Sequence, residues 1–164
     1  RNQIRLSLPE GSSEETICAV LAFYKDYYNP HCQIKTCPYD GITNMLQALR
    51  GDYPLAIVSN KPDPTVKRLC AEYFPGIYAM GESSACPRKP APDMIRHVMD
   101  ALGVQRCIYV GDSEVDVLTA KNADVPCLSV TWGFRTESDL TAAGASWLCH
   151  TPAELPRILK DMMG

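Results

Sequence analysis

Apolar residues recur along the chain in two kinds of pattern, one with helical spacing and one of short continuous runs. Near the start, Ser12 and Glu15 have the spacing of a capping box, and apolar positions then repeat every three or four residues. This predicts a helix over residues 13–28. A second helical pattern begins at Ile42 and ends at Gly51.

From residue 54 onward, short apolar runs alternate with helical patterns. The runs predict strands at 54–58, 77–80, 107–110, 126–130 and 147–149. The intervening patterns predict helices at 63–73, 92–102, 113–120 and 136–143, and a last helix that starts at 151–154. Strands separated by helices predict an α/β fold, a doubly wound (Rossmann-like) parallel sheet with helices on both faces.

Composition narrows the classes of protein that this chain can belong to. Its 164 residues include 16 Lys and Arg against 19 Asp and Glu, and 46% are hydrophobic, which is typical of a globular domain. A net charge of −3 argues against nucleic-acid binding. The longest apolar run, residues 17–23, is far shorter than the roughly 18 residues of a membrane span, so we expect no membrane partner. The 8 cysteines form no CxxC pair, and we expect reduced, buried thiols in a cytoplasmic protein.

Polar side chains follow two of the predicted strands, where ligands bind in open parallel sheets. Ser59 and Asn60 follow strand 54–58, Asp112 and Asp116 follow strand 107–110, and Lys89 lies in the loop before the helix at 92. A hydroxyl, an ammonium and two carboxylates at one end of a sheet can bind a phosphate and a hard divalent cation. The pattern therefore favours phosphoryl chemistry.

Most of these residues also have a purely structural interpretation. Ser59 and Asn60 can form a polar turn, Lys89 can be a solvated loop cation, and Ser113 with Asp116 has the spacing of a capping box. Asp112 is harder to explain in this way. It follows the most apolar strand, where an unpaired buried carboxylate is costly.

The order and spacing of these pieces resemble the haloacid dehalogenase-like (HAD) superfamily, in its phosphoglycolate phosphatase-like branch. The second, third and fourth family motifs correspond to residues 55–61, 89–93 and 109–116, and the resemblance extends from about residue 12 to about residue 160. The Gly-Asp-Ser-x-x-Asp form of the fourth motif is more similar to phosphatases than to dehalogenases or sugar phosphomutases.

The resemblance implies a role for each candidate residue. Ser59 would donate a hydrogen bond to the transferring phosphoryl group, assisted by the backbone amide of Asn60, and Lys89 would neutralise its charge. Asp112 would bind Mg²⁺, directly or through water. Asp116 would be a second acidic group that holds the metal or the lysine.

The family's nucleophile and general acid/base lie in an Asp-x-Asp-Gly motif, and these residues contain no such motif. The resemblance therefore implies that residues 1–36 are the remnant of a helical cap domain and 37–164 an α/β core domain whose first, central strand is missing. We expect strands 54–58 and 107–110 to flank a gap without pairing to each other. Ser59, Lys89 and Asp112 should meet around a polar pocket that opens toward this gap.

The leading hypothesis is the C-terminal portion of a Mg²⁺-dependent phosphatase that hydrolyses a small phosphate monoester, such as 2-phosphoglycolate, through an aspartyl-phosphate. Without its nucleophile, we expect this chain to be inactive alone. The alternatives are a non-catalytic remnant that binds phosphate or a partner, and a phosphomutase or pyrophosphatase of the same superfamily. Expected partners are a small phosphorylated metabolite and either the missing N-terminal segment or a second copy of the chain; substrate identity stays open.

Overall fold

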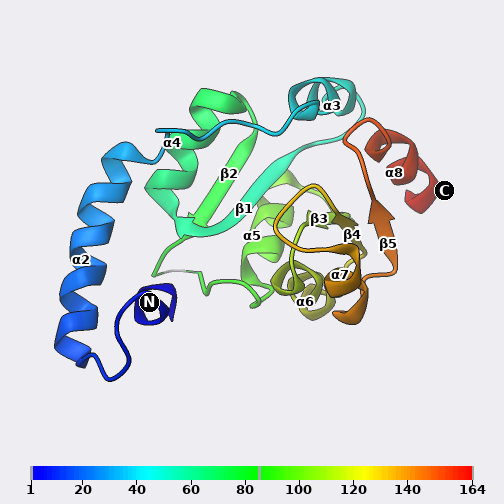
Figure 1. Ribbon diagram of the computed structural model, residues 1–164. Coiled ribbons are helices and arrows are strands. Elements are labelled where there is room, and N and C mark those ends of the chain that lie inside the picture. The colour runs from blue at the N-terminus through cyan, green and yellow to red at the C-terminus, as the bar shows by residue number, and fades with distance from the viewer. Residues whose placement is uncertain (1, 85, 164) are drawn as a thin grey trace. The chain divides into compact units, whose positions relative to one another are not determined.

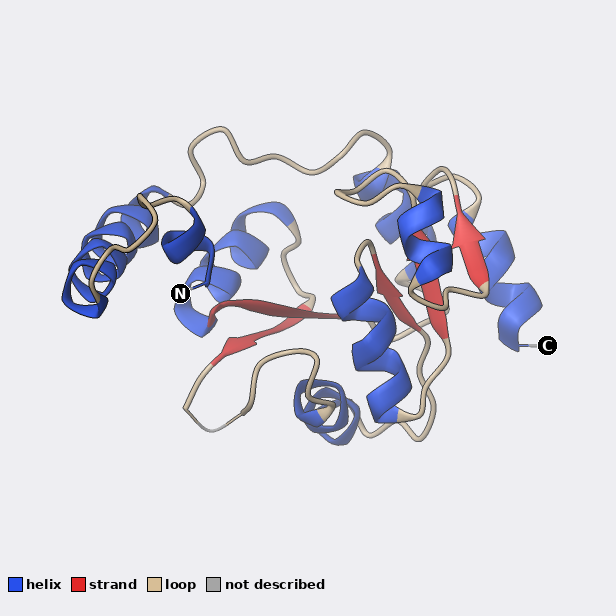
Figure 2. Ribbon diagram, turned by 60° about the horizontal axis from the view of Figure 1, so that its bottom comes forward, coloured by secondary structure: helices blue, strands red, loops and turns tan. Residues whose placement is uncertain are grey.

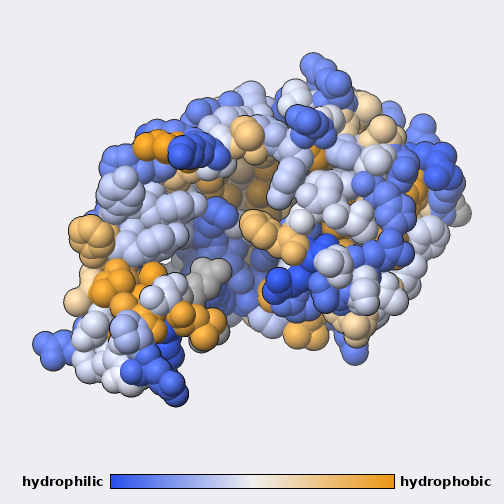
Figure 3. All heavy atoms as spheres, viewed as in Figure 1, coloured by the Kyte–Doolittle hydropathy of each residue, from blue (hydrophilic) through white to orange (hydrophobic). Residues whose placement is uncertain are grey.

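A computed structural model describes residues 2–84 and 86–163. The chain divides into two compact units, Arg1–Cys37 and Pro38–Gly164. The first unit holds α1 (Asn2–Leu6) and α2 (Glu14–His31). Hydrophobic residues lie at its surface over α1 and the adjoining part of α2 (Figure 3), and Leu6 is 79% exposed.

Helix α2 starts one residue away from the expected capping box. The N-cap is Ser13, whose Oγ accepts a hydrogen bond from the Thr16 backbone N–H at 3.1 Å. Ser12 instead donates its hydroxyl to the Pro9 carbonyl at 2.7 Å, so the predicted Ser12–Glu15 box is wrong. Two adjacent serines offer the same capping chemistry, and the preceding turn decides which of them is used.

The second unit alternates helices and parallel strands (Figures 1 and 2), which confirms the α/β fold class. Its elements are α3 (Ile42–Leu49), β1 (Ala56–Pro62), α4 (Asp63–Tyr73), β2 (Tyr78–Glu82), α5 (Asp93–Leu102), β3 (Tyr109–Gly111), α6 (Glu114–Ala123), β4 (Cys127–Val130), α7 (Glu137–Ala142), β5 (Trp147–Cys149) and α8 (Leu155–Met163).

Strand β1 differs from its prediction at both ends. It begins two residues later than 54 and continues through Ser59, Asn60 and Lys61, which the apolar pattern placed in a loop. The continuation pairs with β2, and the register shifts between Val58 and Pro62. Backbone pairing with β2 thus extends the strand beyond its apolar residues.

The strands of this unit form two separate sheets, in the orders β1-β2 and β3-β4-β5. No ladder joins β1 to β3 among the described residues, which confirms the expectation that these two strands do not pair. A cavity of about 630 Å³ is lined by both strands and by α3, α5 and α8. Its walls are mainly apolar, with Ile57, Val98, Val110 and Leu159 among them.

This cavity corrects the expectation of a polar pocket that opens toward the gap. Neither Ser59, Lys89 nor Asp112 lines it, whereas Tyr109 does. The cavity is lined by the first, apolar part of β1, residues 56–58, and by Tyr109 and Val110 of β3. The polar residues lie beyond this apolar section, at the carboxyl ends of the strands.

The core of the second unit consists of apolar side chains from the sheets and from the helices that cover them. One cluster contains Leu128 and Cys149 from the sheet and Leu155 from α8, and another contains Ile95, Tyr109 and Ala120. None of the cysteines forms a disulfide; the expectation of burial is confirmed for Cys32, Cys70, Cys86 and Cys149, holds only in part for Cys107 and Cys127, and is wrong for the exposed Cys18 and Cys37. Within 2–84 and 86–163, no helix has both the length and the apolar character needed to cross a membrane.

Candidate active site

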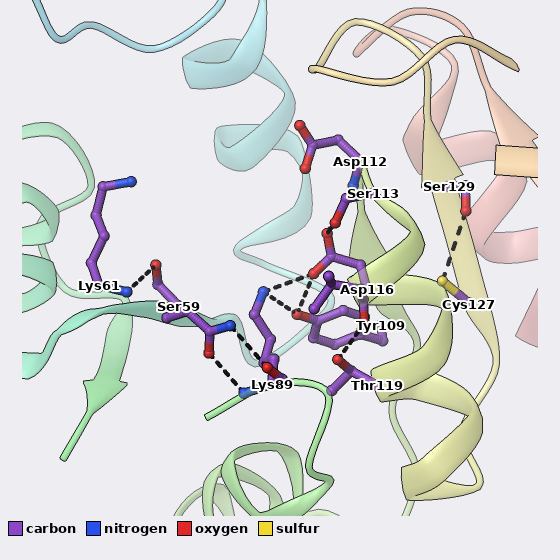
Figure 4. A network of polar contacts seen from close by, with 12 residues as sticks. Ser59, Lys61, Lys89, Tyr109, Asp112, Ser113, Asp116, Thr119, Cys127 and Ser129 are labelled. Atoms are coloured by element: carbon purple, nitrogen blue, oxygen red, sulfur yellow. Dashed lines mark hydrogen bonds and ion pairs between the residues drawn. The ribbon is translucent and has the colours of Figure 1, made fainter. Parts of the chain in front are cut away.

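The carboxyl ends of β1 and β3, together with the loop between β2 and α5, bring four of the five candidate residues into one hydrogen-bonded network (Figure 4). The network starts at Asn60, on β1. Its side chain donates from Nδ2 to the Lys89 carbonyl at 3.0 Å and accepts the Lys89 backbone N–H on Oδ1 at 2.7 Å. This amide therefore binds the backbone of Lys89 at two points, a role that the motif comparison did not include.

Lys89 forms a largely buried ion pair with Asp116, on α6. Its Nζ lies 2.7 Å from Asp116 Oδ1, and the two side chains are only 13% and 7% exposed. The Tyr109 hydroxyl accepts a hydrogen bond from Nζ at 2.9 Å and donates to the same Oδ1 at 3.0 Å. The lysine ammonium is thus held in place by a carboxylate and a phenol (Figure 4).

The Asp116 carboxylate accepts four hydrogen bonds from the protein. Lys89 and Tyr109 donate to Oδ1, while the Ser113 hydroxyl, at 2.6 Å, and the Asp112 backbone N–H, at 3.3 Å, donate to Oδ2. Burial favours the neutral acid, but the charge of Lys89 and the hydrogen bonds outweigh it and lower the pKa of Asp116. Asp116 is therefore an ionised acceptor that organises the site.

Two neighbours of Asp116 depend on this arrangement. Ser113 is the N-cap of α6 but makes no side-chain cap, because its hydroxyl donates to Asp116; the capping-box interpretation is wrong here. Burial and then the charge of Asp116 raise the pKa of the Tyr109 phenol, so it stays protonated and donates. Gly111 is required as well, because a Cβ there would overlap the Asp116 side chain.

Asp112 lies at the same strand end but points away from the Lys89–Asp116 pair (Figure 4). Its Oδ2 accepts the backbone N–H of Phe134 at 3.0 Å. No hydrogen bond to Oδ1 comes from residues 2–84 or 86–163. A Cβ on Gly133 would overlap this carboxylate, so the loop between β4 and α7 contacts it closely.

These contacts separate the two predicted metal ligands. Asp112 offers a carboxylate oxygen that accepts no hydrogen bond from the described residues, whereas both oxygens of Asp116 already accept protein donors. In the described part of the chain, no three His, Cys, Asp or Glu side chains are grouped as a metal site. Mg²⁺ is commonly bound through one or two carboxylates and keeps several waters. The Asp112 carboxylate therefore fits this cation as a ligand.

Ser59 is the candidate that remains outside the network. Its Oγ accepts the Lys61 backbone N–H at 3.2 Å, and Figure 4 shows it apart from Lys89 on the β1 side. It precedes Asn60 directly, so the same strand end carries both residues. The assignment of Ser59 to phosphate binding stays a prediction.

Comparison with known proteins agrees with this geometry. The family model described as haloacid dehalogenase-like hydrolase matches residues 4–130, which is more than half of the chain. The chain belongs to the haloacid dehalogenase-like hydrolases. This result confirms the resemblance drawn from the motifs at the ends of β1 and β3.

Individual HAD-like relatives narrow the comparison. A phosphoglycolate phosphatase from Rhodobacter capsulatus is 34% identical over 128 residues, which cover 74% of this chain and 57% of that protein. Phosphoglycolate phosphatase 1 from Pseudomonas aeruginosa is 33% identical over 128 residues, 74% of this chain and 46% of that protein. The chain thus spans about half the length of the curated relatives that it matches.

A solved structure shows the same fold. A Lactobacillus delbrueckii subsp. bulgaricus protein, inferred to be a phosphoglycolate phosphatase, superposes with a TM-score of 0.87 at 42% identity. The match covers 93% of this chain and 66% of that one. Both sequence and fold therefore place the chain in the phosphoglycolate phosphatase-like part of the HAD-like family.

Three contacts of this HAD-like site escaped the sequence analysis: the Asn60 side chain on Lys89, the Tyr109 hydroxyl, and the Phe134 N–H on Asp112. Tyr109 alone carried a signal that could have been used. It lies two residues before Gly111, and side chains alternate along a strand, so a polar tip at this position can reach the strand end.

We expect Asn60→Asp to destabilise this chain by about 1–3 kcal/mol, the range for leaving a buried polar group unsatisfied. The carboxylate would still accept the Lys89 N–H, but it would place an oxygen against the Lys89 carbonyl instead of a donor. Urea unfolding followed by circular dichroism measures the change. Asn122→Asp is the control, because its exposed amide makes a single hydrogen bond to the Pro90 carbonyl; equal losses in both variants would contradict the two-point contact.

Proposed function

We propose that this chain supplies the lysine and the metal-binding carboxylate of a Mg²⁺-dependent phosphatase that hydrolyses a small phosphate monoester similar to phosphoglycolate. One observation carries the proposal. The Lys89 ammonium, held by Asp116 and Tyr109, lies at the same strand ends as the Asp112 carboxylate, one oxygen of which accepts no donor from residues 2–84 and 86–163. A fixed cation beside a hard anionic ligand suits a phosphoryl group and its metal.

Each residue of this chain has a role in the proposal. Lys89 would bind phosphoryl oxygens and offset the charge that develops on them, and its buried ion pair would keep it in position before substrate arrives. Ser59 and the Asn60 backbone amide would bind the phosphoryl group from β1. Asp116 would orient Lys89 through its ion pair and Asp112 through the Asp112 backbone N–H.

Asp112 would hold the metal through Oδ1, with Oδ2 kept on the Phe134 N–H. When bound, Mg²⁺ supplies charge stabilisation to the phosphoryl oxygens. Asp116 would lie behind this site without binding the metal directly, since its oxygens accept four protein donors.

The nucleophile is the part that these residues do not supply. No Asp-x-Asp-Gly motif occurs in the 164 residues, and the proposed aspartyl-phosphate would form on a residue outside them. The cavity between β1 and β3 supports this division of the site. Both strands have an edge without a partner strand in the described residues, and the apolar walls suit a strand buried on both faces.

Phosphate release by the complete gene product, measured on a panel of phosphate monoesters with and without Mg²⁺, tests the proposal. We expect release to require Mg²⁺ and to be fastest with small monoesters such as 2-phosphoglycolate.

Lys89→Ala should lower kcat by about a hundredfold, the scale of losing one preorganised charged donor. Mg²⁺-independent release, or normal turnover by Lys89→Ala, would contradict the assignment.

A further inference from the structure

The loop of residues 131–136, between β4 and α7, contacts Asp112 at two places. Phe134 donates its backbone N–H to Oδ2 at 3.0 Å, and Gly133 lies so close that a Cβ there would overlap the carboxylate. A carboxylate with one oxygen fixed in this way has a defined orientation, and its other oxygen faces a defined direction. The position of this loop therefore determines where Asp112 Oδ1 lies.

Arg135 links this loop to the helix that follows Asp112. Its Nε donates to Glu114 Oε2 at 2.7 Å and its Nη2 donates to Glu114 Oε1 at 2.8 Å. Glu114 is the first residue of α6, two positions after Asp112. Two parallel hydrogen bonds between a planar guanidinium and a carboxylate fix orientation as well as distance. The ion pair thus joins the segment that carries Phe134 to the turn that carries Asp112.

Overall stability does not explain this ion pair well. The Arg135 and Glu114 side chains are 46% and 49% exposed, and ion pairs between exposed side chains contribute little to the free energy of unfolding. Direct attraction of a cation does not explain it either, because Arg135 places a positive charge near the carboxylate proposed to bind Mg²⁺. With stability and charge set aside, the role left for the Arg135–Glu114 ion pair is to link the loop geometrically to Asp112.

We propose that Arg135 is a positioning residue for Asp112: its ion pair with Glu114 keeps the Phe134 N–H on Oδ2 and so leaves Oδ1 directed toward the cation. The inference rests on the proposed function, because it assumes that Asp112 binds the metal. It gives Arg135 and Glu114 a role that is exerted through Asp112.

Arg135 could act on the cation site through its charge or through the position of the loop, and these two explanations predict opposite changes in cation affinity when the arginine is replaced. If Arg135 acted on the cation site only through its charge, Arg135→Gln would remove a repulsion and tighten cation binding. If it acts by positioning, the same variant loosens the loop and weakens binding. Arg135→Lys adds a second distinction, since it keeps the charge but loses the two-bond geometry.

Binding of Mn²⁺ to the complete protein, followed by electron paramagnetic resonance of the free ion, measures this without an assay of activity. Mn²⁺ is a suitable probe because it prefers the same oxygen ligands as Mg²⁺. We expect Arg135→Gln to weaken binding about tenfold, within the range for partners of metal ligands, and Arg135→Lys to weaken it in the same direction. The double variant Glu114→Arg/Arg135→Glu restores the pair in reverse and should bind Mn²⁺ more tightly than Arg135→Gln.

Arg157→Gln is the matched control. It removes an arginine from another exposed ion pair, with Asp161 on α8, and should leave Mn²⁺ binding unchanged. Thermal unfolding of all variants separates the effects, because Arg135→Gln and Arg157→Gln should shift Tm by similar small amounts. Tighter or unchanged binding by Arg135→Gln would overturn the proposal while leaving Asp112 as the ligand. Absence of wild-type binding, or equal binding by Asp112→Asn, would overturn both the inference and the metal site.

Discussion

Asp112→Asn in the complete protein is expected to abolish Mg²⁺-dependent phosphate release at ordinary Mg²⁺ concentrations. Asparagine preserves the shape of the side chain, and its carbonyl oxygen can still accept the Phe134 N–H. The variant therefore keeps the loop contact but replaces Oδ1, which accepts no donor from the part of the chain that the structure describes, by a neutral NH₂ group. Hard divalent cations bind carboxylate oxygen far better than an amide nitrogen.

The dependence of the rate on Mg²⁺ concentration distinguishes this cause from general damage. Loss of metal affinity should raise the Mg²⁺ concentration for half-maximal rate by about a hundredfold or more, with partial recovery of turnover at high Mg²⁺. Asp161→Asn, which changes an exposed carboxylate on α8, should leave the profile unchanged. Near-normal turnover of Asp112→Asn at ordinary Mg²⁺ would show that Asp112 is not the ligand.

The alternation of apolar runs and helical patterns was sufficient to predict the α/β fold. It placed every helix and strand of the second unit, and β5 was predicted with the bounds Trp147–Cys149 that the structure has. Parallel strands that are buried on both faces give continuous apolar runs, which are distinct from the helical repeats around them. Short β3 was predicted two residues too early, because the run at 107–110 contains apolar residues before Tyr109 that do not pair.

The candidate site was only partly predictable for a different reason. Motif order indicated Lys89, Asp112 and Asp116, because the segments that follow parallel strands meet at one edge of the sheet. The contacts that orient them come from elsewhere in the chain: Asn60 lies 29 residues from Lys89, and Phe134 lies 22 residues from Asp112. Sequence periodicity carries no information on such pairings. Residue type does not reveal which backbone donors, such as the Phe134 N–H, contact the site either.

Gly111 and Gly133 also make contacts that only the structure shows. Each glycine lies where a Cβ would overlap a carboxylate of the site, Asp116 in one case and Asp112 in the other. In the sequence, Gly111 belongs to the Gly-Asp-Ser-x-x-Asp motif and Gly133 lies in a loop, but neither position indicates a close contact with a carboxylate. The structure shows that they allow the backbone to approach the two acidic side chains, and this close approach brings the strand ends and the loop together.

Asp116→Ala is expected to destabilise the chain by about 3–5 kcal/mol, the range for breaking a buried ion pair by removing one partner. The variant would leave four donors without their acceptor: the Lys89 ammonium, the Tyr109 and Ser113 hydroxyls, and the Asp112 backbone N–H. Lys89→Met should cost less, because it removes one donor and leaves three on the carboxylate. Urea unfolding at pH 7 measures both, and a larger loss for Lys89→Met would contradict the central role of Asp116.

The effect of Asp116 on stability should also depend on pH in a defined direction. Its pKa is lower in the folded protein than the ordinary aspartate value of about 3.9. The ionised carboxylate therefore stabilises the fold fully above the ordinary value, and this contribution is lost as pH falls through the lower, folded pKa. The difference in unfolding free energy between wild type and Asp116→Ala should thus be largest near neutral pH and shrink below about pH 4. A difference that stays constant from pH 7 to pH 3 would show that the charge of Asp116 contributes nothing, and that only its size matters.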